Sequence, residues 1–198
     1  MFPGGNRRPG PGGKAGAALA ACALAALLGV AGCGSSGPGT PSWANALGSG
    51  VTVVPPGSTA PGNDSPGGVM VGVIDALSSG HVSDFCRYEQ PSVQSSCNAT
   101  MSQVTPAEVK GQLPTFKNVR LAYVAIDGTK ALIGLTGTIC LPKQTPSCFT
   151  NNDPAAIFDS GKPFATLWSE AESAASNAYS LSPAVEINGS WYAETSSS

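Results

Sequence analysis

The spacing of apolar residues changes along this chain, and that change limits the possible fold more than any other feature. Between residues 65 and 101 the apolar positions recur every three or four residues, as on one face of a helix. From residue 119 to residue 194 they mostly alternate with polar positions, as in strands, with one helical interruption. Helices followed by hairpins predict an α+β domain, in which N-terminal helices pack on a curved antiparallel sheet.

The expected helices have recognisable ends. The first carries an apolar stripe formed by Val69, Met70, Val73, Ile74 and Leu77. Ser65 can cap it with Pro66 in its first turn, and Gly80 can end it. Short helices are expected over 82–88, 91–97 and 106–109. A later amphipathic helix over 163–174 places on one face Phe164, Leu167, Trp168 and Ala171.

Asp127-Gly128 predicts the turn of a first hairpin, between alternating residues of 119–123 and of 133–141. A two-residue Asp-Gly loop would place Leu121 and Leu135 on opposite faces of the sheet. A three-residue loop with Gly128 in the left-handed conformation keeps both on one face. We therefore expect a bulged hairpin at this position.

Asn188-Gly189 predicts a second hairpin, with a type I′ turn between strands over 179–187 and 190–194. The register of a two-residue loop pairs Val185 with Tyr192 and Glu186 with Trp191. Tyr192 is then expected to face the core and Trp191 the opposite face. Pro183 indicates an edge position or a bulge, because proline cannot donate to a neighbouring strand.

Residues 1–32 have the pattern of an export signal. Arg7, Arg8 and Lys14 precede an uncharged, Ala-rich run of 17 residues, which is short for a membrane-spanning helix. Small residues then lead to Cys33, an order that is similar to the lipobox of bacterial lipoproteins. That resemblance implies cleavage before Cys33, lipid on its sulfur, and anchoring to the cell membrane on the extracytoplasmic side. An ordinary signal peptide with an incidental cysteine is the alternative, and Arg7-Arg8 leaves both the general and the twin-arginine export routes open.

Residues 33–66 are expected to form the lipidated cysteine and a disordered tether. Gly, Pro, Ser and Thr make up 22 of the 33 residues from Gly34 to Pro66. The segment therefore contains too few apolar side chains for their burial to offset the entropy of ordering the chain. Trp43 and the run from Val51 to Val54 interrupt this composition. They are interpreted either as apolar residues of a loose linker or as a short docking segment. The globular domain is expected to span 67–198.

Four cysteines remain in the expected domain, an even number that suits an oxidising compartment. We favour the pairs Cys86–Cys97 and Cys140–Cys148, because each partner is near in sequence and the stretch between Cys140 and Cys148 resembles a loop. Three pairings are formally possible. Metal binding is the alternative, but the cysteine spacings match no zinc pattern and His81 is the only histidine. We therefore expect no metal and no cofactor.

Charge and motifs exclude several functions. Seven basic and twelve acidic residues follow residue 63, a net charge of −5, which offers no electrostatic footprint for nucleic acid. The chain contains no nucleophile elbow, phosphate-binding loop or metalloprotease motif. His81, at a helix start, is interpreted as a solvated or capping residue rather than as a general base.

The N-terminal helices, the Cys86/Cys97 segment and the closing Ile187–Tyr192 stretch together resemble the nuclear transport factor two-like (cystatin-like) cone fold, and in particular small actinobacterial secreted lipoproteins with such a domain. The resemblance implies a cone-shaped α+β domain over about 130 residues, but that superfamily includes both enzymes and binders. An isomerase-like site would need a carboxylate base and polar donors around an apolar pocket. Asp84, Tyr88 and Tyr123 are the candidate members of such a pocket.

Three functions follow from these patterns. The first is a non-catalytic envelope lipoprotein that is held to the membrane through Cys33 and binds an envelope protein or a small apolar ligand. The second is a lipid-anchored enzyme of the cyclase/isomerase type that uses the cone pocket. The third is a structural spacer that forms a homodimer through the sheet face bearing Trp191.

Overall fold

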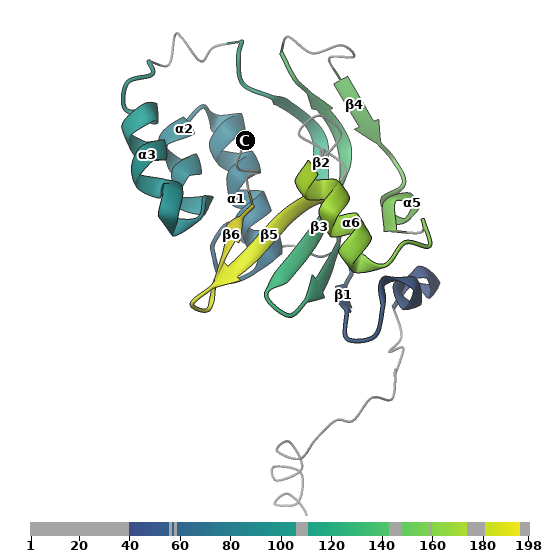
Figure 1. Ribbon diagram of the computed structural model, residues 1–198. Coiled ribbons are helices and arrows are strands. Elements are labelled where there is room, and N and C mark those ends of the chain that lie inside the picture. Colours follow the sequence, from purple (N-terminus) through teal and green to yellow (C-terminus); the bar gives the residue numbers. More distant parts are fainter. Residues whose placement is uncertain are drawn as a thin grey trace, which may run out of the picture. The chain divides into compact units, whose positions relative to one another are not determined.

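The structure, a computed structural model, describes residues 40–55, 57, 59–105, 111–142, 148–158, 160–173 and 181–194. Figure 1 shows helices and strands in the following order along the chain: η1 (Ser42–Leu47), β1 (Thr52–Val54), α1 (Pro66–Ser79), α2 (Val82–Phe85), η2 (Cys86–Tyr88), α3 (Pro91–Met101), β2 (Thr115–Asp127), β3 (Lys130–Cys140), β4 (Cys148–Asn151), α5 (Pro154–Phe158), α6 (Phe164–Ser173), β5 (Leu181–Ile187) and β6 (Ser190–Ala193). The α+β class is confirmed. Cys33 and the expected signal peptide, tether start and helix over 106–109 lie outside the described residues.

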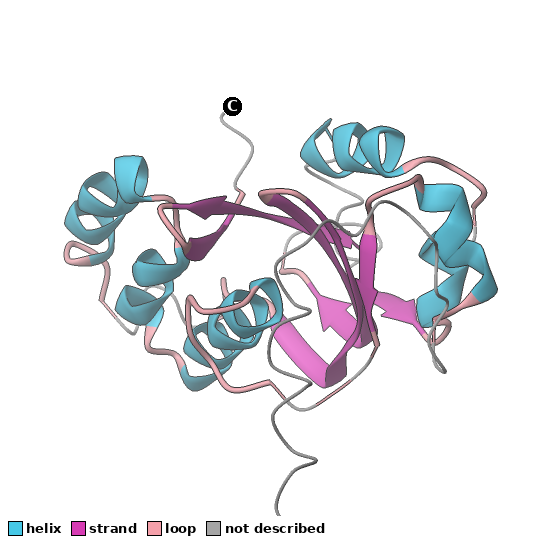
Figure 2. Ribbon diagram, turned by 90° about the horizontal axis from the view of Figure 1, so that it is seen from below, coloured by secondary structure: helices cyan, strands magenta, loops and turns pink. Residues whose placement is uncertain are grey.

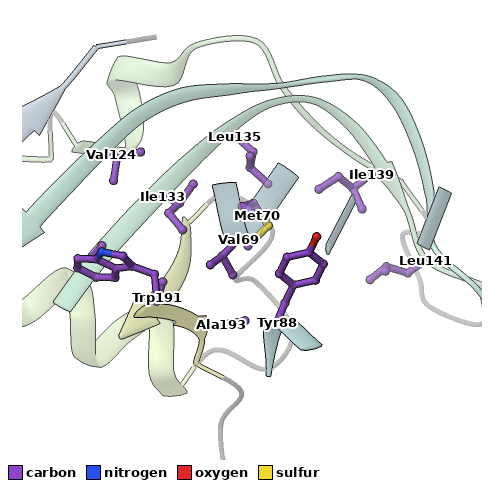
Figure 3. Close-up of a cluster of buried hydrophobic side chains, with 12 residues drawn as sticks. Val69, Met70, Tyr88, Val124, Ile133, Leu135, Ile139, Leu141, Trp191 and Ala193 are labelled. Atoms are coloured by element: carbon purple, nitrogen blue, oxygen red, sulfur yellow. The ribbon is translucent and has the colours of Figure 1, made fainter. Parts of the chain in front are cut away.

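The sheet has six antiparallel strands in the order β1-β2-β3-β5-β6, with β4 paired to β3 off this path. One edge of β3 pairs with β2, while its other edge pairs first with β5, over 130–134, and then with β4, over 137–140. At the start of the second segment, Gly137 has a φ of +105°, and a Cβ on it would lie 2.6 Å from the carbonyl oxygen of Asn118. Glycine therefore allows the close approach at the bend of the β2–β3 ribbon, which curves over the helices in Figure 3.

The hairpin between β2 and β3 confirms one expectation and corrects another. Leu121 pairs directly with Leu135, so both side chains lie on one face as predicted. The loop, however, has two residues, Gly128 and Thr129, because Asp127 pairs with Lys130. The irregularity that places Leu121 opposite Leu135 is a register shift between Leu121 and Val124, away from the loop, and a second shift lies between Lys117 and Arg120. The prediction of a three-residue loop was therefore wrong, although the need for a bulge was correct.

The register of β5 and β6 is the predicted one: Val185 pairs with Tyr192, and Glu186 pairs with Trp191. The predicted orientation of Trp191 is wrong, because its side chain is only 8% exposed and belongs to the apolar cluster beneath the sheet (Figure 3). Trp191 therefore offers no exposed surface through which a homodimer could form. Whether the protein is a dimeric spacer is not tested by this finding.

Helices cover both faces of the sheet, as Figure 2 shows. On one face α1 and η2 enclose a cluster that includes Val69, Tyr88, Ile133 and Trp191. On the other face η1, α5 and α6 enclose a second cluster that includes Trp43, Leu132, Phe158 and Trp168. The neighbouring residues Leu132 and Ile133 are both fully buried, on opposite faces of β3. The predicted amphipathic helix is confirmed as α6, which buries its four expected residues in the second cluster.

Pro183 lies in a strand that is paired on both sides, so the edge position expected for β5 is wrong. The carbonyl oxygen of Pro183 accepts a hydrogen bond from the N–H of Glu194 at 3.0 Å, just beyond the end of β6. In an antiparallel ladder the N–H and C=O of one residue point to the same neighbour. The nitrogen of Pro183, which carries no hydrogen, therefore points toward the end of β6. The sheet loses at most one hydrogen bond there, at the end of a strand.

Helix α1 begins and ends as predicted. The Ser65 hydroxyl accepts a hydrogen bond from the Gly68 N–H at 3.0 Å, Pro66 opens the helix, and Gly80 has a φ of +76° just after it. The two favoured cysteine pairs lie at bonding distance, with sulfur–sulfur separations of 2.04 Å for Cys86–Cys97 and 2.10 Å for Cys140–Cys148. The first pair joins η2 to α3, and the second joins β3 to β4.

The expected tether boundary at residue 66 is wrong for the described residues before it. Leu47 in η1 is only 2% exposed, Trp43 stacks on Phe158 with ring centroids 5.0 Å apart, and β1 pairs with β2. Asn63 and Trp191 exchange two hydrogen bonds, Trp191 N–H to Asn63 O at 2.7 Å and Asn63 Nδ2 to Trp191 O at 2.6 Å. Burying a Trp and a Leu, at about 1.5–3 kcal/mol each, contributes with the strand pairing and these hydrogen bonds to offsetting the entropy of ordering this segment.

Candidate functional site

A cleft of about 640 Å³ lies between α1 and β2. From α1 it is lined by Val71 and Ile74, and from the sheet by Val119, Leu121 and Leu135. These side chains are mostly half-buried, because they continue the apolar face of the first cluster to the point where α1 and β2 diverge. Half-buried apolar side chains around a concave surface are typical of a small-molecule site.

The cleft continues toward both ends of α1. Toward the start of the helix, a pocket of about 280 Å³ shares Gly57, Thr59 and Leu121 with it and extends to Val54 and Ile126. Toward the end of the helix, a pocket of about 670 Å³ shares Ser78 with it and extends to Phe116. The three spaces therefore follow one another along the flank of α1, and we call them together the α1–β2 groove.

The glycines of α1 place the helix beside the groove. A Cβ on Gly67 would lie 2.9 Å from Leu121 Cδ2, and a Cβ on Gly72 would come within 3.0 Å of three atoms of Tyr88. Glycine at these positions lets the helix approach β2 on one side and the Tyr88 ring on the other. The local sequence thus fixes the distance between α1 and its neighbours, and with it the width of the groove.

Two opposite charges line the central cleft, Asp75 from α1 and Arg120 from β2. They do not form an ion pair with each other, since within the described ranges the one salt bridge joins Lys162 to Glu170. Asp75 acts at longer range on Arg87 of η2. The pKa of Arg87 is raised, first by the hydrogen bond that its guanidinium donates to the Tyr88 hydroxyl and by the charge interaction with Tyr88, and to a lesser extent by Asp84 and Asp75.

The three residues predicted to share a pocket do not come together. Asp84 is exposed on α2. Tyr88 is 1% exposed in the first cluster, and Figure 3 shows its ring between Met70 and Leu141, with the Arg87 guanidinium carbon 4.7 Å from the ring centroid. Tyr123 packs on the opposite face of the sheet, edge-on to Trp43 at 5.2 Å. The prediction failed because it treated one sheet face as the core, whereas both are covered.

The described residues offer little for acid–base or metal chemistry. Within the described ranges no three His, Cys, Asp or Glu side chains gather closely enough to hold a metal ion. His81 is exposed at the far end of the groove. Glu194, whose pKa is raised by burial and then by the charge of Glu172, lies beside Gln90 and does not line the cleft. The arrangement can bind an apolar molecule, and its two charges can orient a polar end.

Sequence reasoning missed Val71, Asp75 and Arg120, and it placed Gly57 and Thr59 in the tether. A weak signal existed, since Val71 and Asp75 lie at helical spacing beside Ile74, a member of the apolar stripe of α1. No pattern in the sequence indicates that β2 diverges from the helix there.

Among the helices of the described ranges, none is long and apolar enough to cross a membrane. Comparison of the chain with models of protein families, with curated proteins and with solved structures gives no match.

Proposed function

We propose that this protein is a non-catalytic extracytoplasmic lipoprotein whose domain binds a small apolar ligand in the α1–β2 groove. The observation that carries the proposal is the central cleft, whose volume of about 640 Å³ lies within the roughly 300–1,000 Å³ typical of ligand sites. Its lining is mainly apolar, with few polar groups to orient a ligand.

The location rests on the sequence alone. The charged start, the Ala-rich run and the small residues before Cys33 support export and lipidation of that cysteine. Two acyl chains on one anchor give stable membrane attachment, where a single chain is marginal. Two disulfides within the described domain agree with an oxidising compartment.

The three residues proposed for a cyclase/isomerase site do not support that alternative. Such an enzyme needs a carboxylate and polar donors that converge on one apolar pocket. Asp84 is exposed, and Tyr88 and Tyr123 lie on opposite faces of the sheet. The resemblance to the nuclear transport factor two-like fold stays a proposal, supported by the helices beneath a curved antiparallel sheet and by a cleft between them.

Native mass spectrometry of the full-length protein, purified from the cells that make it, tests ligand binding. We expect a retained apolar compound, and we expect its loss in an Ile74→Trp variant, whose indole fills the cleft. Val93→Trp is the matched control, because Val93 on α3 is 39% exposed and does not line the cleft. The proposal is refuted if wild-type protein retains no compound and binds no apolar fluorescent probe.

The anchor has a separate test. Replacing Cys33 by Ala removes the only atom to which the expected lipid can be attached. We expect the variant to move from the membrane fraction to the soluble fraction, with Cys22→Ala as the control that leaves the distribution unchanged. If the Cys33→Ala protein remains in the membrane fraction after cleavage of its signal peptide, lipid anchoring is wrong.

A further inference from the structure

The α1–β2 groove has different chemistry along its length. At the start of α1 the pocket is lined by Val54, Pro55, Leu121, Val124 and Ile126, together with small residues, and among the lining residues that the structure describes none carries a charge. The two lining charges, Asp75 and Arg120, belong to the central cleft. An occupant that satisfies both parts has an uncharged apolar segment and a charged end.

The length of the apolar part follows from the helix. Gly67 lines the uncharged pocket and Asp75 the central cleft, and eight residues of α helix separate them by about 12 Å. One leaflet of a bilayer has an apolar thickness of about 15 Å, half of the hydrocarbon core. The apolar part of the groove is therefore slightly shorter than the apolar thickness of one leaflet, a length that part of a single acyl chain can fill.

The charges indicate what the head carries. Asp75 and Arg120 reach the same cleft from opposite walls, yet they are not paired with each other, and both are exposed. A ligand with only a negative charge would be attracted by Arg120 but repelled by Asp75. A ligand with only a positive charge would be attracted by Asp75 but repelled by Arg120. A head with both charges satisfies both residues.

We propose that the groove binds a single-chain amphiphile with a zwitterionic head, its chain toward the start of α1 and its head between Asp75 and Arg120. This inference rests on the proposed function, because it specifies the ligand of the same groove. The anionic part of the head lies at Arg120, whose guanidinium forks toward phosphate or carboxylate, and the ammonium lies at Asp75.

The test compares four ligands that each have a twelve-carbon chain: dodecylphosphocholine, dodecanoate, dodecyltrimethylammonium and dodecanol. Each is used below its critical micelle concentration or, for dodecanol, below its solubility limit. The full-length Cys33→Ala chain is used, so that no lipid attached to the protein competes. We expect dodecylphosphocholine to bind tightest. Each exposed charge should contribute about twofold to fivefold in affinity.

Single variants separate the two contacts. Arg120→Gln is expected to weaken dodecylphosphocholine and dodecanoate about twofold to fivefold, and Asp75→Asn to weaken dodecylphosphocholine and dodecyltrimethylammonium to the same extent. Lys117→Gln and Asp84→Asn are the matched controls, since both residues are exposed charges that do not line the cleft. Circular dichroism confirms that each variant is folded.

The outcomes distinguish the two proposals. If none of the four ligands binds, the proposed function itself fails. If all four bind with equal affinity, or if a singly charged ligand binds best, the groove takes an apolar chain but the zwitterionic head is wrong. Tightest binding of dodecylphosphocholine, with the crossed effects of the two variants, supports the inference.

Discussion

Replacing Gly72 by Ala tests whether the close packing of α1 against Tyr88 holds this face of the domain together. Two effects oppose each other. Alanine is a better helix former than glycine by about 1 kcal/mol, so an unhindered site would gain stability. At Gly72, however, the added Cβ would come within 3.0 Å of three atoms of the Tyr88 ring.

The ring has little room to move away. Tyr88 is 1% exposed, its hydroxyl accepts a hydrogen bond from Arg87, and it contributes to the same buried cluster as Met70 and Ile139. Overpacking of this kind typically costs about 1–3 kcal/mol, and a clash with several ring atoms belongs at the upper end. After the helix-propensity gain we expect a net loss of about 2 kcal/mol, a melting temperature lower by about 4–8 °C.

Thermal unfolding followed by circular dichroism, with both disulfides oxidised, measures the effect. Ser78→Ala on the exposed side of the same helix is the control and should leave the melting temperature nearly unchanged. Tyr88→Leu should itself destabilise, but adding Gly72→Ala to it should cost nothing further, because the methyl group then occupies vacated space. The reasoning is refuted if Gly72→Ala melts at or above the wild-type temperature, or if the costs of the two changes simply add.

Three further predictions address other parts of the fold. Gly134→Ala should lower the free energy of unfolding by about 1–3 kcal/mol, because its Cβ would lie 2.8 Å from Phe158 Cε2 in the second cluster; an unchanged chemical-denaturation midpoint contradicts this. The Cys140→Ser/Cys148→Ser double variant should lose about 2.5 kcal/mol, the value expected for a sequence separation of 8, and peptide mapping of the oxidised wild type should recover the Cys140–Cys148 pair. Burial and the nearby Glu172 raise the pKa of Glu194 above its ordinary 4.5, so the folded state favours the protonated form of this carboxyl. Protonation of Glu194 should therefore stabilise the wild-type protein as the pH falls toward 4.5. That stabilisation should be lost as the pH rises through the raised pKa. Glu194→Gln should remove that pH dependence, and an identical pH profile in wild type and variant would show that the carboxyl is not perturbed.

Features with a local cause were predictable from the sequence. The Ser65 cap, the type of turn at Asn188-Gly189 and the apolar face of α6 each depend on residues a few positions apart. The favoured disulfides also join cysteines that are close in sequence. In each of these features, the interacting residues are neighbours within one helix or strand, or are joined by one short loop.

Features with a distant cause were not predictable in this way. Trp43 lies in a Gly/Pro/Ser-rich stretch, and its packing depends on Phe158 and Tyr123, more than 75 residues away. The alternation in β6 gives the two faces of the strand but not which of them meets α1, so Trp191 was assigned to the wrong side. The groove was missed for the same reason, because its walls belong to α1 and β2, whose separation depends on the packing of Gly67 and Gly72.

Coverage of both sheet faces also restricts where the domain can bind a ligand. Around Leu132 and Ile133 the central strand is fully buried above and below, so neither face offers a surface there. Half-exposed apolar side chains in a concave setting do line the cleft between α1 and β2, where β1 pairs only with residues 124–126 of β2. An enzyme of the cone type would place its polar groups inside the enclosed cluster. There the Tyr88 hydroxyl already accepts a hydrogen bond from Arg87, and the Tyr88 side chain packs closely against Gly72. This packing therefore supports the proposal that a ligand binds along the flank of α1.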